Sequence, residues 1–180
     1  QYFSQKRKLW LKLKGYDFDF EKAKSLSAQS VLPNSEQPTV TLDYAEGSDA
    51  IAQYLQDQLR QLGIDLNLNP LGGAEFQQKL QSGTSEMYYL GWRSELGDAG
   101  DFMQSIVHSS EAVGDSGAFN GTKYSNKNVD NLIDKSEQDL NIKTRLKSLQ
   151  DAMKILVEDD IAGVPLFETQ TIFAFQNKIK

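Results

Sequence analysis

Residues 91–102 hold the densest group of chemically active side chains in this sequence. Trp92 and Arg93 come first, carboxylates follow at Glu95, Asp98 and Asp101, and glycines are spread among them. An indole can stack on a ligand, and a guanidinium can pair with a carboxylate. Carboxylates can hold a cationic group, and glycine lets the backbone approach a ligand closely. The stretch therefore predicts a ligand-binding loop.

The neighbouring sequence indicates how this loop is positioned. The apolar run 87–90 before it predicts a buried strand, and the pattern from 101 to 109 predicts a helix. Ligands of open α/β sheets bind beyond the carboxyl ends of the strands. We therefore take Trp92, Arg93, Glu95 and Asp98 as candidate ligand contacts, with a solvated surface position as the alternative for Arg93. Asp101 is expected to cap the following helix.

Other site chemistries find little support in the sequence. The chain has no cysteine and one histidine, His108, which we expect to be structural or solvated. It contains no Gly-x-Ser-x-Gly elbow, phosphate loop or dinucleotide fingerprint, and its acids do not follow EF-hand spacing. We therefore expect no catalytic residue, no bound metal and no cofactor. A small hydrolase that uses Glu95 and Asp98 is an alternative.

Hydrophobic periodicity predicts alternating helices and strands. Asp19 is expected to cap a short helix that ends before Pro33, and Gly63 to end another. Residues 110–128 are expected to be mostly irregular, and they contain a glycosylation sequon at Asn120. The helix that Gly63 ends covers 51–62, and other predicted helices cover 73–80, 129–136 and 143–159. The predicted strands cover 39–44, 64–68, 87–90, 164–167 and 171–175. This alternation predicts a three-layer α/β domain with a mixed, mainly parallel sheet.

Length and charge limit the number of domains and the classes of binding partner. The 180 residues suffice for one domain, and the net charge of −6 argues against a nucleic-acid-binding surface. A basic cluster around Lys6, Arg7 and Lys8 is the local exception, and we interpret it as a solvated helix face. No apolar run has the length of a membrane span. The chain begins with Gln1 rather than Met, so we expect a fragment or a processed segment.

Five short motifs, in order along the chain, resemble one family. These stretches are residues 16–24, 58–66, 91–102, 119–130 and 158–167. In this order they resemble the extracellular solute-binding proteins of ABC importers for oligopeptides, dipeptides and nickel, known as family 5.

The resemblance implies a fold, a place in a larger protein and a function. It implies a lobe of the type II periplasmic-binding-protein kind, with residues 1–14 as a leader or connecting helix and 15–180 as the C-terminal-side lobe of a two-lobed protein. Such a protein binds a peptide or another small solute and delivers it to ABC permease subunits. The family is exported, periplasmic or tethered to the membrane by a lipid, and we expect this fragment to be monomeric.

The resemblance also implies roles for two residues of the 91–102 loop. Trp92 matches an aromatic residue at the cleft, and Glu95 matches an aspartate that pairs with the α-amino group of a bound peptide. A sensory ligand-binding domain with the same fold is the alternative to a transport protein.

Overall fold

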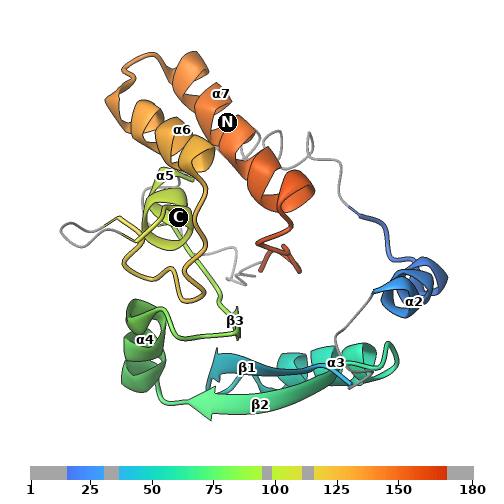
Figure 1. Ribbon diagram of the computed structural model, residues 1–180. Helices are drawn as coiled ribbons and strands as arrows, with labels where there is room; N and C mark the ends of the chain where they lie inside the picture. Colours follow the sequence, from blue (N-terminus) through green and yellow to red (C-terminus); the bar gives the residue numbers. More distant parts are fainter. Residues whose placement is uncertain (1–15, 31–36, 95–98, 111–115, 170–180) are drawn as a thin grey trace, which may run out of the picture.

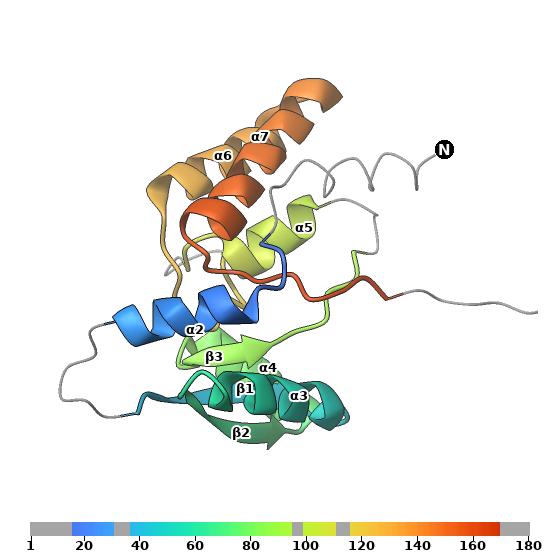
Figure 2. The same ribbon diagram turned by 90° about the vertical axis from the view of Figure 1, so that its right-hand side faces the viewer.

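A parallel sheet and a group of helices make up the structure (Figures 1 and 2). The computed structural model describes residues 16–30, 37–94, 99–110 and 116–169. Helices α5, α6 and α7 lie together on one side, and strand β3 leads from the sheet toward them. In the described part of the chain, no helix is both long and apolar enough to cross a membrane.

The sheet has the order β2-β1-β3. Its strands are β1 (Thr39–Ala45), β2 (Asp65–Leu71) and β3 (Met87–Tyr89). All of β1 pairs with β2 in parallel, and residues 42–44 of β1 pair in parallel with β3. A parallel pair needs a crossover between its strands, which helix α3 (Asp49–Arg60) supplies from β1 to β2. The predicted alternation of strands and helices thus produces parallel strand pairs, as expected for a mainly parallel sheet.

Alternation along the strands assigns one helix to each face of the sheet. Successive side chains of a strand point to opposite faces. One face packs with α3 around Leu42, Tyr44, Ala52 and Leu66. The other face packs with α4 (Gly73–Ser82) through Leu71, Phe76 and Leu80, with Ala45 against them. These two helix layers with the sheet between them match the predicted three-layer α/β arrangement.

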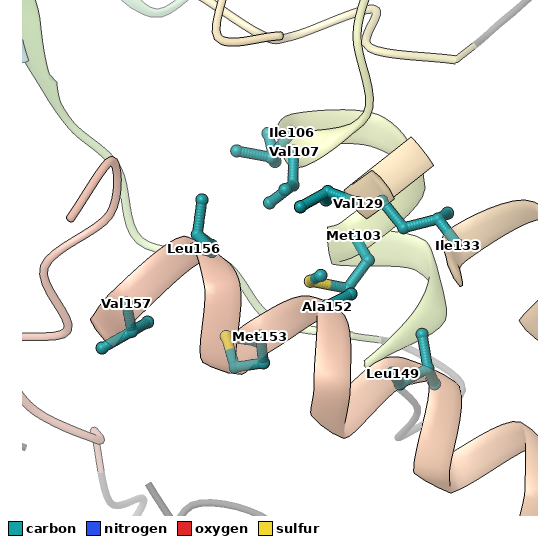
Figure 3. Close-up of a cluster of buried hydrophobic side chains, with 10 residues drawn as sticks. All are labelled: Met103, Ile106, Val107, Val129, Ile133, Leu149, Ala152, Met153, Leu156 and Val157. Carbon is teal, nitrogen blue, oxygen red and sulfur yellow. The ribbon is translucent and has the colours of Figure 1, made fainter. Parts of the chain in front are cut away.

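The remaining helices pack around a second core, which Figure 3 shows in close-up. They are α5 (Gly100–Phe102), α6 (Lys127–Gln138) and α7 (Ile142–Lys154). Helix α5 continues as the π-helical turn η2 (Met103–Val107), and α7 continues as the π-helical turn η3 (Ile155–Asp159). Met103, Val129, Ile133 and Leu149 are at most 1% exposed there. Apolar residues at helical spacing in three separate segments thus converge on one interior.

Helix ends follow the expected chemistry. Asp19 caps α2 (Phe20–Gln29), because its Oδ1 accepts a hydrogen bond from the Lys22 N–H at 2.9 Å. Asn126 caps α6 in the same way, with its Oδ1 3.0 Å from the Asn128 nitrogen. Gly63 follows α3 with a φ of +78°, a conformation that favours glycine.

Two expectations about elements are wrong. Residues 164–167 form no strand; Val164 is 69% and Phe167 60% exposed, and no strand pairs with them in the described residues. A β-rich composition makes an extended segment, but a strand also needs a hydrogen-bonding partner. Asp101 does not cap the helix either, because α5 begins one residue earlier and Ala99 holds the cap position. The predictions for 1–14 and 171–175 lie outside the described residues.

Candidate ligand-binding site

The 91–102 loop begins at the carboxyl-terminal edge of the sheet. Because the three strands are parallel, Ala45, Leu71 and Tyr89 end at the same edge. Tyr89 pairs with Tyr44, and Trp92 follows three residues later. This is the edge at which open α/β sheets bind ligands. The structure therefore places the start of the loop where the sequence predicted it.

Trp92 lies partly exposed against the helix that follows the loop. Its side chain is 39% exposed, and its ring meets Phe102 of α5 edge to face, with centroids 6.2 Å apart and planes at 62°. Such a geometry is favourable for two aromatic rings. Phe102 in turn packs against the core of the helical group. The indole thus contacts Phe102 and leaves part of its surface exposed.

Of the charged residues in the 91–102 loop, the structure describes Arg93 and Asp101. Arg93 is exposed, which fits both a ligand contact and a solvated position. Asp101 lies inside α5, and its Oδ1 accepts a hydrogen bond from the Phe102 N–H at 2.8 Å. It therefore stabilises the first turn of the helix from within that turn. Glu95 and Asp98 lie outside the described residues, and their roles stay predictions.

His108 is a packing residue. It is 3% exposed at the end of η2, and its Nδ1 lies 2.8 Å from the Ser109 carbonyl oxygen. Its Nε2 lies 3.3 Å from Asp134 Oδ1 of α6, without the geometry of a hydrogen bond. The expected structural role is confirmed. Among the residues that the structure places, no group of three or more His, Cys, Asp or Glu could hold a metal ion.

Tyr124, Asn126 and Asp160 form a polar link between the start of α6 and the end of η3. The Tyr124 hydroxyl and the Asn126 Nδ2 both donate to Asp160 Oδ2, at 2.5 Å and 2.8 Å. Burial, and then the hydrogen bond to Asp160, raise the pKa of the Tyr124 phenol. The hydrogen bonds from Tyr124 and Asn126 lower the pKa of the Asp160 carboxyl. The link thus favours a neutral phenol beside an ionised carboxylate.

Sequence reasoning missed the part played by residues 116–124. This stretch was expected to be irregular, which it is, but it also contacts the segments on both sides of the 91–102 loop. Asn120 fits a glycosylation sequon, yet its side chain is 2% exposed and its Nδ2 donates to two carbonyl oxygens. Such an amide is not available to a glycosyltransferase. The available signal was the pair of glycines, Gly117 and Gly121, which allow close backbone approach.

Known sequences resemble this chain over most of its length. The family model for bacterial extracellular solute-binding proteins, family 5 Middle, matches residues 2–114. "Probable D,D-dipeptide-binding periplasmic protein DdpA" of Escherichia coli (strain K12) is 27% identical over 168 residues. That alignment covers 92% of this chain and 31% of the relative, so the chain spans about a third of the relative's length.

Solved structures agree in fold. A periplasmic oligopeptide-binding protein from Borrelia burgdorferi matches with a TM-score of 0.66 and 28% identity, over 79% of this chain and 28% of that one. The periplasmic binding protein DppA from Helicobacter pylori, in complex with the peptide STSA, matches with a TM-score of 0.68 and 23% identity, over 82% and 28%. The described fold is thus that of a type II periplasmic binding protein, and the chain belongs to the bacterial extracellular solute-binding proteins of family 5.

Proposed function

We propose that this chain is one lobe of the substrate-binding component of an ABC importer for peptides. The observation that carries the proposal is the family match, together with the alignment of nearly the whole chain to a periplasmic dipeptide-binding protein. Residues 15–180 are the C-terminal-side lobe, and 1–14 connect it to the rest of the protein. The complete protein acts outside the cytoplasmic membrane, bound to it by a lipid or free, and its permease subunits receive the ligand.

The 91–102 loop supplies this lobe's half of the ligand site. Trp92 stacks on the ligand with the exposed part of its ring. Glu95 pairs with a ligand cation such as an α-amino group, Arg93 pairs with a carboxylate, and Asp98 contributes a second negative charge. Two-lobed binding proteins close around the ligand by a hinge motion. The lobe therefore binds without catalysing a reaction, and the isolated chain binds weakly because the other half of the site is missing.

Identification of the natural cargo tests the proposed class of ligand. The full-length protein is purified from its host without added ligand and analysed by native mass spectrometry. We expect an added mass that fragments as a peptide. An added mass that fragments as a sugar or a metal chelate would contradict the peptide assignment, and nanomolar peptide affinity of the isolated 180 residues would contradict the split site.

A paired substitution tests the place of the site. In the full-length protein, Trp92→Ala is expected to weaken binding of D-alanyl-D-alanine or the peptide STSA by about thirtyfold or more, the loss typical of a buried aromatic anchor. Tyr54→Ala is the matched control, because Tyr54 is a 61% exposed aromatic residue on α3. Isothermal titration calorimetry measures both variants. Equal affinities in the two variants would place the ligand elsewhere.

A further inference from the structure

The irregular segment before α6 runs along the helix that follows the 91–102 loop. We call residues 116–124 the brace segment; Figure 1 shows this connection in yellow, between α5 and α4. The Gly117 N–H donates to the Gln104 carbonyl oxygen at 2.8 Å, and the Phe119 N–H donates to that of Ser105 at 2.9 Å. The last carbonyls of a helix lack partners within the helix. The brace segment therefore supplies hydrogen-bond donors to the end of η2.

Asn120 joins the brace segment to the end of that helix. Its Nδ2 donates to the His108 carbonyl oxygen at 3.0 Å and to the Tyr124 carbonyl oxygen at 2.7 Å, and its Oδ1 accepts from the Tyr124 N–H at 2.9 Å. The side chain is 2% exposed, so water cannot easily replace these bonds. One buried amide thus fixes the fold of the brace segment and its attachment to the helix.

Gly121 brings the opposite side of the brace segment against the sheet layer. Its carbonyl oxygen accepts a hydrogen bond from the Ser85 N–H at 2.9 Å. A Cβ at this position would lie 2.6 Å from Leu80 Cδ2 and 3.1 Å from two ring carbons of Tyr88. Tyr88 belongs to β3, the strand that leads into the 91–102 loop. The absence of a side chain at Gly121 therefore permits the close approach to the strand.

The two cores of the protein meet at the same segment. Phe119 of the brace packs against the core under α4 and against the core of the helical group, and so do Tyr88 and Leu90. Leu90 is two residues from Trp92 in sequence. The brace segment thus contacts the strand stem of the loop (87–90) and its helix stem (100–108).

We propose that Asn120 is a positioning residue of the ligand site: it fixes the helix stem to the brace segment and thereby holds Trp92 against Phe102. Part of this inference rests on the proposed function, since it assumes that Trp92 contacts the ligand. Side chains of a binding site need support from residues behind them to keep a productive geometry. The brace segment is hydrogen-bonded to the helix stem and packs on both stems.

Fluorescence tests the geometry without a ligand. The sequence has two tryptophans, so Trp10→Phe leaves Trp92 as the single reporter in the 180-residue chain. In this background, Asn120→Ala is expected to shift the Trp92 emission to longer wavelength and to increase its quenching by acrylamide. Asn126→Ala is the matched control, because it removes a buttressing asparagine of the same region whose partners are Asn128, Val129 and Asp160. We expect the control to leave the emission unchanged.

Fluorescence is recorded well below each variant's melting temperature, which circular dichroism measures, so that a change in emission does not come from unfolding. If Asn120→Ala does not fold, Asn120→Ser takes its place, because it keeps a polar group at this buried position but is too short to bond the carbonyl oxygens of both His108 and Tyr124. A Trp92 emission that is the same in the folded brace variant and in the Asn126 control would overturn the proposal.

Affinity tests the consequence for binding in the full-length protein. Asn120→Ala is expected to weaken binding of D-alanyl-D-alanine or STSA by roughly three- to thirtyfold, and Asn126→Ala by less than about twofold. Equal losses in both variants would show a general effect of stability and overturn the proposal. If the unmodified protein binds neither probe, the proposed ligand class fails, and the fluorescence result by itself decides whether Asn120 positions Trp92.

Discussion

Gly117, in the brace segment, offers a sharp test of how closely the backbone is packed behind the proposed site. Its φ is +64°, and a Cβ built on it would lie 2.4 Å from the His108 carbonyl oxygen, 2.7 Å from the Ser110 nitrogen and 2.8 Å from the Ser109 carbonyl carbon. All three neighbours are backbone atoms, which cannot turn aside as a side chain can. Gly117→Ala must therefore displace the chain itself.

The expected cost has two parts. A left-handed conformation costs a residue with a Cβ about 1–2 kcal/mol, and forcing an extra methyl group into a packed region costs about 1–3 kcal/mol. The free energy of unfolding of Gly117→Ala should fall by about 2–5 kcal/mol. Gly63→Ala is the matched control: its φ is +78°, but no atom lies within 4 Å of the added Cβ. Only the conformational cost of about 1–2 kcal/mol applies there.

Urea unfolding followed by circular dichroism measures both variants in the 180-residue chain. With a slope of about 2 kcal/mol per molar urea, the midpoint of Gly117→Ala should lie about 0.5–1.5 M below that of Gly63→Ala. Equal midpoints would refute the reasoning, because they would mean that the backbone around His108 gives way at no cost.

Two further predictions concern the helical group. Leu149→Ala should lower the free energy of unfolding by about 2–5 kcal/mol because Leu149 is 1% exposed, whereas Leu140→Ala should change it by less than about 0.5 kcal/mol because Leu140 is 99% exposed; urea midpoints compare them, and similar losses would contradict the assigned core. The link between Tyr124 and Asp160 should make stability depend on pH at both ends. Since hydrogen bonds lower the folded pKa of Asp160, its contribution is present above about pH 3.9 and is lost as the pH falls through the folded value. Since burial raises the folded pKa of Tyr124, its contribution is present below about pH 10 and is lost at higher pH. Melting temperatures of the unmodified chain and Tyr124→Phe check this, and an equally steep alkaline decline in both would contradict it.

Local patterns predicted the elements wherever a residue acts on its near neighbours. The alternation of residues 39–44 predicted β1, because opposite faces of one strand meet different helices. Asp19 was predicted as a helix cap because the N–H that it bonds lies three residues away. Residues 164–167 were predicted as a strand on the same kind of local signal, and there it failed, since a strand depends on a partner distant in sequence.

Some features of the candidate site were likewise predicted from local sequence, and others were not. The position of the 91–102 loop between a strand and a helix followed from the sequence. The contact of Trp92 with Phe102 was not predicted, because the nine residues between them permit many separations of the rings. Glu95 and Asp98 remain predictions from the resemblance and from their chemistry.

The sequence by itself determined most of the helices and strands, their order and the resemblance to the family, since periodicity, caps and motifs are local properties of the chain. Only the tertiary structure decided that residues 116–124 bond one stem of the loop and pack on both, that Asn120 is buried rather than open to glycosylation, and that His108 packs against α6. The physical reason is that these contacts join residues 12 or more positions apart, where the packing of two cores, and not the preference of any one segment, sets the geometry.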